Sequence, residues 1–295
     1  MRFSFYALAV LAFAVVAGAQ AASSDLNERG SSPTDPPSLN ERDVATGGVA
    51  LGFSGDPTTT GKPTDKTPSL TISDAASTPL PTQLHYYHGP ILWKPVRLYY
   101  ILYGNHWNKS QEELIVYFSN CISNTTWWNL VKLPDFHDHL AGSGGLVVKK
   151  VVYCSGSCAR PRITRPSIAS VVISQLQAGQ LPVDRNGIYI VLTSPDVIAT
   201  DSCHNPKGSC GFHDHTSYKS TPIVYGWIAN WHGTGCTIGC LTRNRVYSPN
   251  NDVGIDGLIN VLAHEFAEAV TNPYYNAWEG APNANWENGD FCAWK

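Results

Sequence analysis

The stretch that most constrains the fold of this chain is a strongly apolar segment near its end, residues 256–273. Its apolar residues recur at three- and four-residue spacing, which predicts a helix with one apolar face. Asp256 is expected to cap the first turn, and Pro273 to end the helix. Because so little of the segment is polar, we expect the helix to be buried.

The same helix carries a polar stripe that resembles a metal-binding motif. His264 and Glu268 are four residues apart, so both side chains project from one face, with Glu265 one step round. This is the metalloprotease pattern H-E-x-x-H with Glu at the second His, in which one helical turn sets two ligands at a metal ion and the intervening Glu acts as general base. The pattern predicts His264 and Glu268 as zinc ligands and Glu265 as the catalytic base.

An ordinary structural explanation stands beside this one. His264 and Glu268 could equally form a solvated pair on a surface helix. The apolar setting favours the metal site, because a buried carboxylate needs a partner or a metal ion.

A catalytic zinc site needs a third protein ligand. Glu287 and Asp290 follow the helix, in a segment that a disulfide at Cys292 would hold in place. We favour Glu287 as the third ligand, with Asp290 or a histidine as alternatives. A His/Glu/Glu set would neutralise the zinc charge, so the site would be slow or structural. The other interpretation is that both acidic residues only solubilise a loop.

Two His-Asp-His triplets, at 137–139 and 213–215, are further candidates for metal binding. Alternate residues of a strand share a face, so the two histidines of either triplet would chelate a metal ion if the segment were a strand. Both triplets lie in polar, turn-like stretches, and we therefore assign neither to the site. His213 is the more interesting, since it follows a Cys-rich loop and is well placed to border a cleft.

The N-terminal part of the chain predicts secretion. Residues 1–21 have a positive start at Arg2, a short apolar run, and small residues at Ala19 and Ala21, as in a signal peptide cleaved after Ala21. The apolar run is too short for a membrane span. Residues 22–82 are rich in Ser, Thr, Pro, Asp and Gly, so they cannot bury enough apolar surface to fold and are expected to form a disordered tail. The net charge of −3 argues against nucleic-acid binding.

All nine tryptophans follow residue 84, and residues 83–295 are expected to form one domain. Strands are predicted at 96–103, 145–153, 188–193 and 221–231, and helices at 110–122, capped by Ser110, and at 166–178. This alternation indicates an α/β or α+β domain with a central mixed sheet. A sheet followed by a long helix with a metal motif is, by analogy, the general plan of zinc metalloproteases.

The even number of eight cysteines is typical of disulfides in a secreted protein, with a zinc knuckle as the alternative. Two glycosylation sequons, at Asn108 and Asn124, agree with secretion. Short sequence separations predict three disulfides and leave a fourth pair by elimination: Cys154–Cys158, Cys203–Cys210, Cys236–Cys240 and Cys121–Cys292.

Several stretches occur in a recognisable order: YYHGPIL at 86–92, YILYG at 100–104, WW at 127–128, IVLTSPDV at 190–197, cysteine loops at 203–213 and 236–240, and PNNDVGIDG at 249–257. Together they resemble the EXORDIUM-like, phosphate-induced protein family of secreted proteins. The resemblance implies an extracellular, wall-associated protein and supplies no biochemical activity. The His264-Glu265-x-x-Glu268 helix and the Glu287-x-Gly-Asp290 segment are similar to microbial-type members, which supports Glu287 as third ligand.

Two functions therefore follow from the sequence. The first is a secreted zinc-dependent hydrolase, most simply a peptidase acting on an extracellular peptide or protein. The second is a non-catalytic extracellular protein that binds a wall polymer or a host surface, with a structural metal ion or none.

Overall fold

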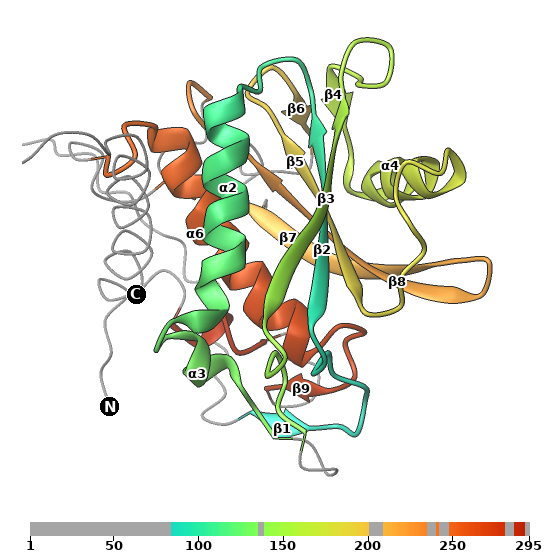
Figure 1. The fold of residues 1–295 in the computed structure, drawn as a ribbon, viewed down its shortest axis with the longest axis vertical. Coiled ribbons are helices and arrows are strands. Elements are labelled where there is room, and N and C mark those ends of the chain that lie inside the picture. Colours follow the sequence, from blue (N-terminus) through green and yellow to red (C-terminus); the bar gives the residue numbers. More distant parts are fainter. Residues whose placement is uncertain are drawn as a thin grey trace, which may run out of the picture. The chain divides into compact units, whose positions relative to one another are not determined.

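The computed structural model describes residues 84–134, 139–200, 209–234, 240–241, 248–280 and 286–292. Their centre is a five-stranded sheet of order β3-β2-β5-β8-β7 (Figure 1). Neighbours among the first four strands are parallel, whereas β7 pairs antiparallel with β8. The predicted α/β class with a central mixed sheet is confirmed.

Four of these strands lie close to their predicted ranges. They are β2 (Val96–Tyr103), β3 (Leu146–Cys154), β5 (Gly187–Thr193) and β8 (Thr221–Ala229). Every residue of β5 is buried, as its continuous apolar run indicates for a central parallel strand.

The fifth strand, β7 (Gly211–Tyr218), was not predicted. It contains the second His-Asp-His triplet, for which we expected a turn-like stretch. That expectation was wrong because the strand forms the sheet edge, where only part of the sequence is buried. Its pairing with the buried strand β8 stabilises a sequence that has little β-pattern of its own.

Helices cover both faces of the sheet. Helices α2 (Lys109–Cys121) and α6 (Val253–Thr271) pack on one face, together with the short α3 (Trp128–Val131), and α4 (Arg165–Gln177) packs on the other (Figure 1). The side chains of β2 alternate between the two faces of the sheet. Leu98 and Tyr100 pack in the core beneath α2 and α6, whereas Tyr99 and Ile101 pack in the core beneath α4.

Two predicted helix caps were wrong. The side chain of Asn108, rather than Ser110, accepts a hydrogen bond at the start of α2. Asp252 caps α6 in the same way, so this helix begins earlier than predicted. Asp256 lies inside the first turn, where its carboxylate accepts hydrogen bonds from Ser248 and Asn250 and fixes the loop that leads into α6.

Two pairs of short strands lie outside the central sheet. β1 (His85–Tyr86) pairs antiparallel with β9 (Trp278–Glu279), which joins the start of the domain to the segment after α6. β4 (Arg162–Ile163) pairs in parallel with β6 (Ile198–Ala199), and 3-10 turns occupy η1 (Ile122–Asn124) and η2 (Asp290–Cys292). Among the described residues, no helix has the length and apolarity to span a membrane.

The disulfides agree only in part with the prediction. Cys154–Cys158 is confirmed. Cys210 pairs with Cys240, so both short-range pairs that involved these residues were wrong. Cys121 is a free thiol, which contradicts its assignment to Cys292. Sequence proximity failed here because the fold brings the start of β7 beside the segment that precedes α6.

Several predictions fall on residues outside the described ranges. These are the signal peptide at 1–21, the tail at 22–82, Cys203, Cys236, and His137 with Asp138 of the first triplet.

Candidate functional site

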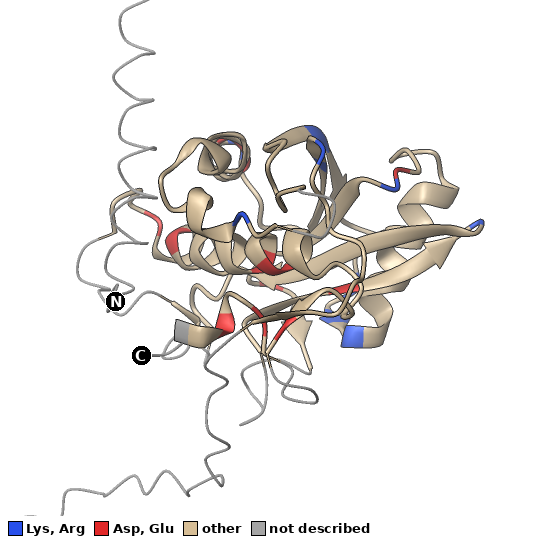
Figure 2. Cartoon of the chain, turned by 90° about the horizontal axis from the view of Figure 1, so that it is seen from below, with Lys and Arg blue, Asp and Glu red and all other residues tan. Residues whose placement is uncertain are grey.

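Acidic and imidazole side chains from three segments meet at α6. The helix carries Asp256, Glu265 and Glu268 and has no Lys or Arg along its length. Figure 2 colours the acidic residues of the domain red and its Lys and Arg residues blue. The side chains that gather beside it come from β7, from α6 itself and from the segment 286–290: His213, His264, Glu265, Glu268, Glu287 and Asp290.

One group of donors reaches the solvent. His264 Nε2 lies 3.0 Å from Glu268 Oε1 and 3.6 Å from Asp290 Oδ1. Donor atoms of these three residues lie within 4.8 Å of one another. The side chains of His264 and Asp290 are 26% and 28% exposed, whereas Glu268 is buried. This group is therefore accessible from one side.

A second group lies deeper and shares Glu268 with the first. His213 Nδ1 lies 3.5 Å from Glu265 Oε2 and 3.6 Å from Glu268 Oε2, and all three residues are buried. The opposite ring nitrogen, Nε2, lies 3.6 Å from Glu287 Oε1. His213 thus connects α6 to the segment that follows it.

The distances suit ligands of a metal ion better than hydrogen-bonded pairs. Most are 3.5–3.6 Å, beyond the usual range of roughly 2.7–3.2 Å for a hydrogen bond. Two ligands of a tetrahedral zinc ion stand roughly 3.3–3.4 Å apart when each bond is about 2.0–2.1 Å. The buried Glu268 Oε1 accepts no hydrogen bond within the described part of the chain. Imidazole nitrogen and carboxylate oxygen are donors that zinc accepts, so these residues fit such an ion.

The cluster has more negative than positive charge, and the pKa values reflect this. Burial alone would lower the pKa of His264, but the charges of Glu268, Glu265 and Asp290 raise it to about 10. Burial raises the pKa of Glu287 to about 8, helped by the charge of Glu268 and opposed by His213. Burial and the charge of Glu268 likewise raise the pKa of Asp290, to about 6. A divalent cation would supply the missing positive charge.

Backbone and amide groups hold the surrounding segments in place. At the C-terminal end of α6, Asn272 Nδ2 donates hydrogen bonds to Glu287 Oε1 at 2.8 Å and to Glu279 Oε1 at 3.0 Å.

Gly289 lies so close to the site that a Cβ atom there would stand 2.8 Å from both Glu268 Oε1 and His264 Nδ1. A side chain at position 289 would therefore displace the side chains of His264 or Glu268.

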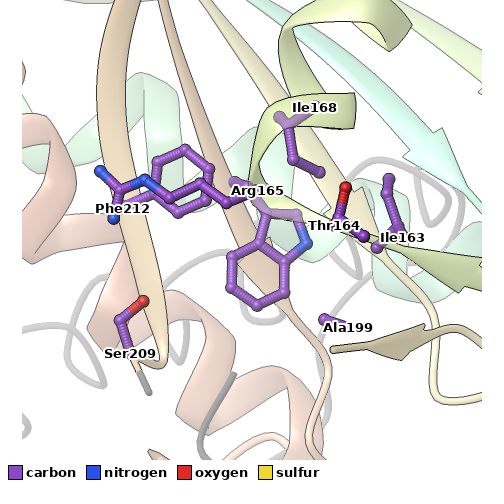
Figure 3. Close-up of a pocket in the computed structure, with 8 residues that line it drawn as sticks. Ile163, Thr164, Arg165, Ile168, Ala199, Ser209 and Phe212 are labelled. Atoms are coloured by element: carbon purple, nitrogen blue, oxygen red, sulfur yellow. The ribbon is translucent and has the colours of Figure 1, made fainter. Parts of the chain in front are cut away.

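A small pocket on the opposite face of the sheet contributes nothing to this cluster. It lies between α4, β6, β7 and β8 and is partly open to solvent (Figure 3). Its lining includes Ile168, Phe212 and Trp227, and the Arg165 guanidinium stands 4.1 Å from the centre of the Phe212 ring. Phe212 and His213 are adjacent in β7, so they point to opposite faces.

Comparison with known proteins identifies the family of this domain. A family model described as "Phosphate-induced protein 1 conserved region" matches residues 84–294, nearly the whole folded domain. The chain belongs to this family. The resemblance drawn from the sequence is therefore confirmed at the level of the phosphate-induced, EXORDIUM-like family.

Several plant members of the EXORDIUM-like family are similar to this chain. Protein EXORDIUM-like 3 of Arabidopsis thaliana is 34% identical over 239 residues, which covers 71% of this chain and 68% of that protein. Protein EXORDIUM-like 5 of the same plant is 32% identical, and the match spans 63% of its length and 71% of this chain. Protein PHOSPHATE-INDUCED 1 of Nicotiana tabacum is 27% identical, with 71% of each chain covered. No solved structure matches this chain.

The predicted site residues of this EXORDIUM-like domain lie near one another but divide into the two groups. Asp290 lies beside His264 and Glu268, whereas Glu287 lies beside His213. Glu265 faces His213 as well.

His213 is the residue that the sequence analysis left out. We assigned its triplet no role because we expected a turn, whereas it lies on a strand with a buried side chain. The alternation of Phe212, His213 and Asp214 was the available signal, but it is short. His215, on the same face, is exposed and packs near Tyr274.

Proposed function

We propose that this EXORDIUM-like protein is a secreted, zinc-dependent hydrolase that cleaves peptide bonds in an extracellular peptide or protein. The α6 cluster would then be a zincin-like site. One observation carries the proposal: within the described residues the buried Glu268 Oε1 makes no hydrogen bond, although His264 Nε2 lies 3.0 Å away, and it lies among donors suited to zinc.

The distances favour His264, Glu268 and Asp290 as the residues that would hold zinc. Asp290 Oδ1 lies 3.6 Å from His264 Nε2, whereas Glu287 contacts His213 instead. This assignment replaces the preference for Glu287 that the sequence suggested. The exposed sides of His264 and Asp290 give substrate a path to the site.

When bound, zinc would polarise the substrate carbonyl and make water a stronger acid. Glu265 is the group that would accept a proton from the attacking water and pass it to the leaving amine. Because Glu265 directly follows His264 in α6, its side chain projects from a neighbouring side of the helix, next to the face that carries His264 and Glu268. Two carboxylates in the ligand set reduce the effective charge of the ion, so we expect slow turnover.

Secretion is part of the proposal. It is supported by the signal-like sequence at residues 1–21 and by the disulfides Cys154–Cys158 and Cys210–Cys240, since disulfides persist in oxidising compartments. Fractionation of the native source followed by N-terminal sequencing would test it, with cleavage after Ala21 expected. Retention of the intact N-terminus inside the cell would contradict it.

The enzymatic proposal is tested on the purified full chain. Zinc content is measured by mass spectrometry, and cleavage is measured on a peptide library for the wild type, Glu265→Gln and a control, Glu112→Gln, which lies on α2. We expect zinc in all three proteins and cleavage by the wild type and the control alone. Zinc without cleavage would favour a non-catalytic protein that binds a wall polymer or host surface. Absence of zinc from the wild type would overturn the metal site itself.

A further inference from the structure

The two carboxylate oxygens of Glu268 face different histidines. Oε1 lies 3.0 Å from His264 Nε2, whereas Oε2 lies 3.6 Å from His213 Nδ1. A carboxylate that presents one oxygen to each of two donor groups has the arrangement of a bridging ligand in a two-metal site. The deeper group therefore calls for its own explanation.

We propose that His213, Glu265 and Glu268 Oε2 form a second divalent-cation site, and that its occupation inhibits the hydrolase. The inhibitory effect rests on the proposed function, because it acts through the general base Glu265. The existence of the second site does not depend on catalysis.

The orientation of the His213 ring supports the site. Its Nε2 atom lies 3.4 Å from the backbone oxygen of Asn272 and 3.6 Å from Glu287 Oε1, both hydrogen-bond acceptors. A proton on Nε2 leaves the lone pair of Nδ1 directed toward Glu265 and Glu268. Metal-binding histidines commonly present their second nitrogen to a carboxylate or a backbone carbonyl in this manner.

A simple ion pair explains the deeper group less well. Charge-assisted hydrogen bonds between imidazolium and carboxylate are typically about 2.7–2.9 Å long. His213 Nδ1 stands 3.5 Å from Glu265 and 3.6 Å from Glu268, although all three residues are buried in a fixed position. These separations leave room for an ion between the donors.

Inhibition follows from the use of Glu265. A carboxylate oxygen that binds a cation is no longer available to accept a proton from water. Activity should therefore rise as the accessible site of His264, Glu268 and Asp290 fills, and fall when a higher metal concentration fills the deeper site.

The test is a zinc titration of the metal-free full chain, with bound zinc measured after equilibrium dialysis. We expect two zinc ions per chain for the wild type. His213→Gln should keep the first ion and weaken the second by more than about 100-fold, because the loss of a ligand exceeds the usual effect of losing an outer-shell partner. Glu265→Gln should also bind one ion. The matched control is His215→Gln, on the same strand but exposed, and should bind two.

The second readout is the ratio of cleavage rates at low and high zinc. The cleavage rate at high zinc divided by the rate at low zinc should fall below one in the wild type and in His215→Gln, and stay near one in His213→Gln. A single bound ion in the wild type, or two in both His213→Gln and Glu265→Gln, would overturn the second site. Two ions without cleavage would leave the second site standing and remove the proposed function, whereas one ion with cleavage would do the reverse.

Discussion

Two polar networks in this domain, one partly buried and one largely buried, differ in how their charges are compensated. At the amino ends of β2 and β5, Asp184 accepts hydrogen bonds from the Arg97 guanidinium, the Tyr99 hydroxyl at 2.8 Å and the Asn186 amide at 2.9 Å. At α6, two imidazoles face four carboxylates, and within the described part of the chain the buried Glu268 Oε1 makes no hydrogen bond, although His264 Nε2 lies 3.0 Å away.

The difference separates a network that protein groups satisfy from the cluster that we propose binds a cation. A satisfied buried carboxylate contributes stability, because its hydrogen bonds replace those it made to water. A carboxylate without donors costs stability unless a ligand compensates for it. The Asp184 network is satisfied by protein groups alone, whereas a cation would compensate the α6 cluster under the proposal made above.

The largest effect is expected from replacing Glu265, the general base of the proposed hydrolase. Glu265→Gln should reduce kcat/KM by about 10²–10⁴-fold, because an amide cannot accept the proton. Zinc at the accessible site should remain. Steady-state kinetics with parallel zinc analysis measures both, and undiminished cleavage would remove Glu265 from this role.

Removing the carboxylate of Asp290 is expected to lower zinc affinity more than removing that of Glu287. Asp290→Asn should weaken binding of the first zinc ion by more than about 100-fold, as for loss of a ligand, whereas Glu287→Gln should weaken it less. Competition with a chromogenic chelator measures both constants. The opposite ranking would restore Glu287 as the third ligand.

Stability of the metal-free protein should respond in opposite directions in the two networks. The pKa of Glu287 is raised to about 8, so its ionisation costs stability as the pH rises from the unfolded value of about 4.3 through 8. Glu287→Gln should therefore stabilise the metal-free protein by up to about 5 kcal/mol at pH 8.5, with little effect near pH 4. Urea unfolding at both pH values measures this, and equal effects at both would contradict the charge argument.

The smallest effect is expected from replacing Asp184, whose carboxylate is satisfied by hydrogen bonds from the protein. Burial would raise the pKa of Asp184, but hydrogen bonds from Arg97, Tyr99 and Asn186 lower it overall. Its contribution is therefore present above the unfolded pKa of about 3.9 and is lost as the pH falls through the lower folded value. Asp184→Asn should cost about 1–2 kcal/mol at pH 7 and leave zinc content unchanged. Calorimetry combined with zinc analysis checks both results, and a loss of zinc would show that the networks are coupled.

Much of the fold could be predicted from local sequence patterns. The buried strand β5 and the helix α6 are long, regular and strongly apolar, so the side-chain period alone indicates each element. The His264-x-x-x-Glu268 spacing placed two candidate ligands on one helical face for the same reason.

Other features depended on contacts between distant residues. β7 is a strand because it pairs with β8, Cys210 reaches Cys240 across 30 residues of sequence, and His213 meets Glu265 only through that strand. That Asp290 rather than Glu287 lies beside His264 depends on the path of the segment over Gly289. Local sequence determined which helices and strands form, because their periodicity lies within a few turns of chain. The tertiary structure alone decided which donors converge, because that depends on how separate elements pack.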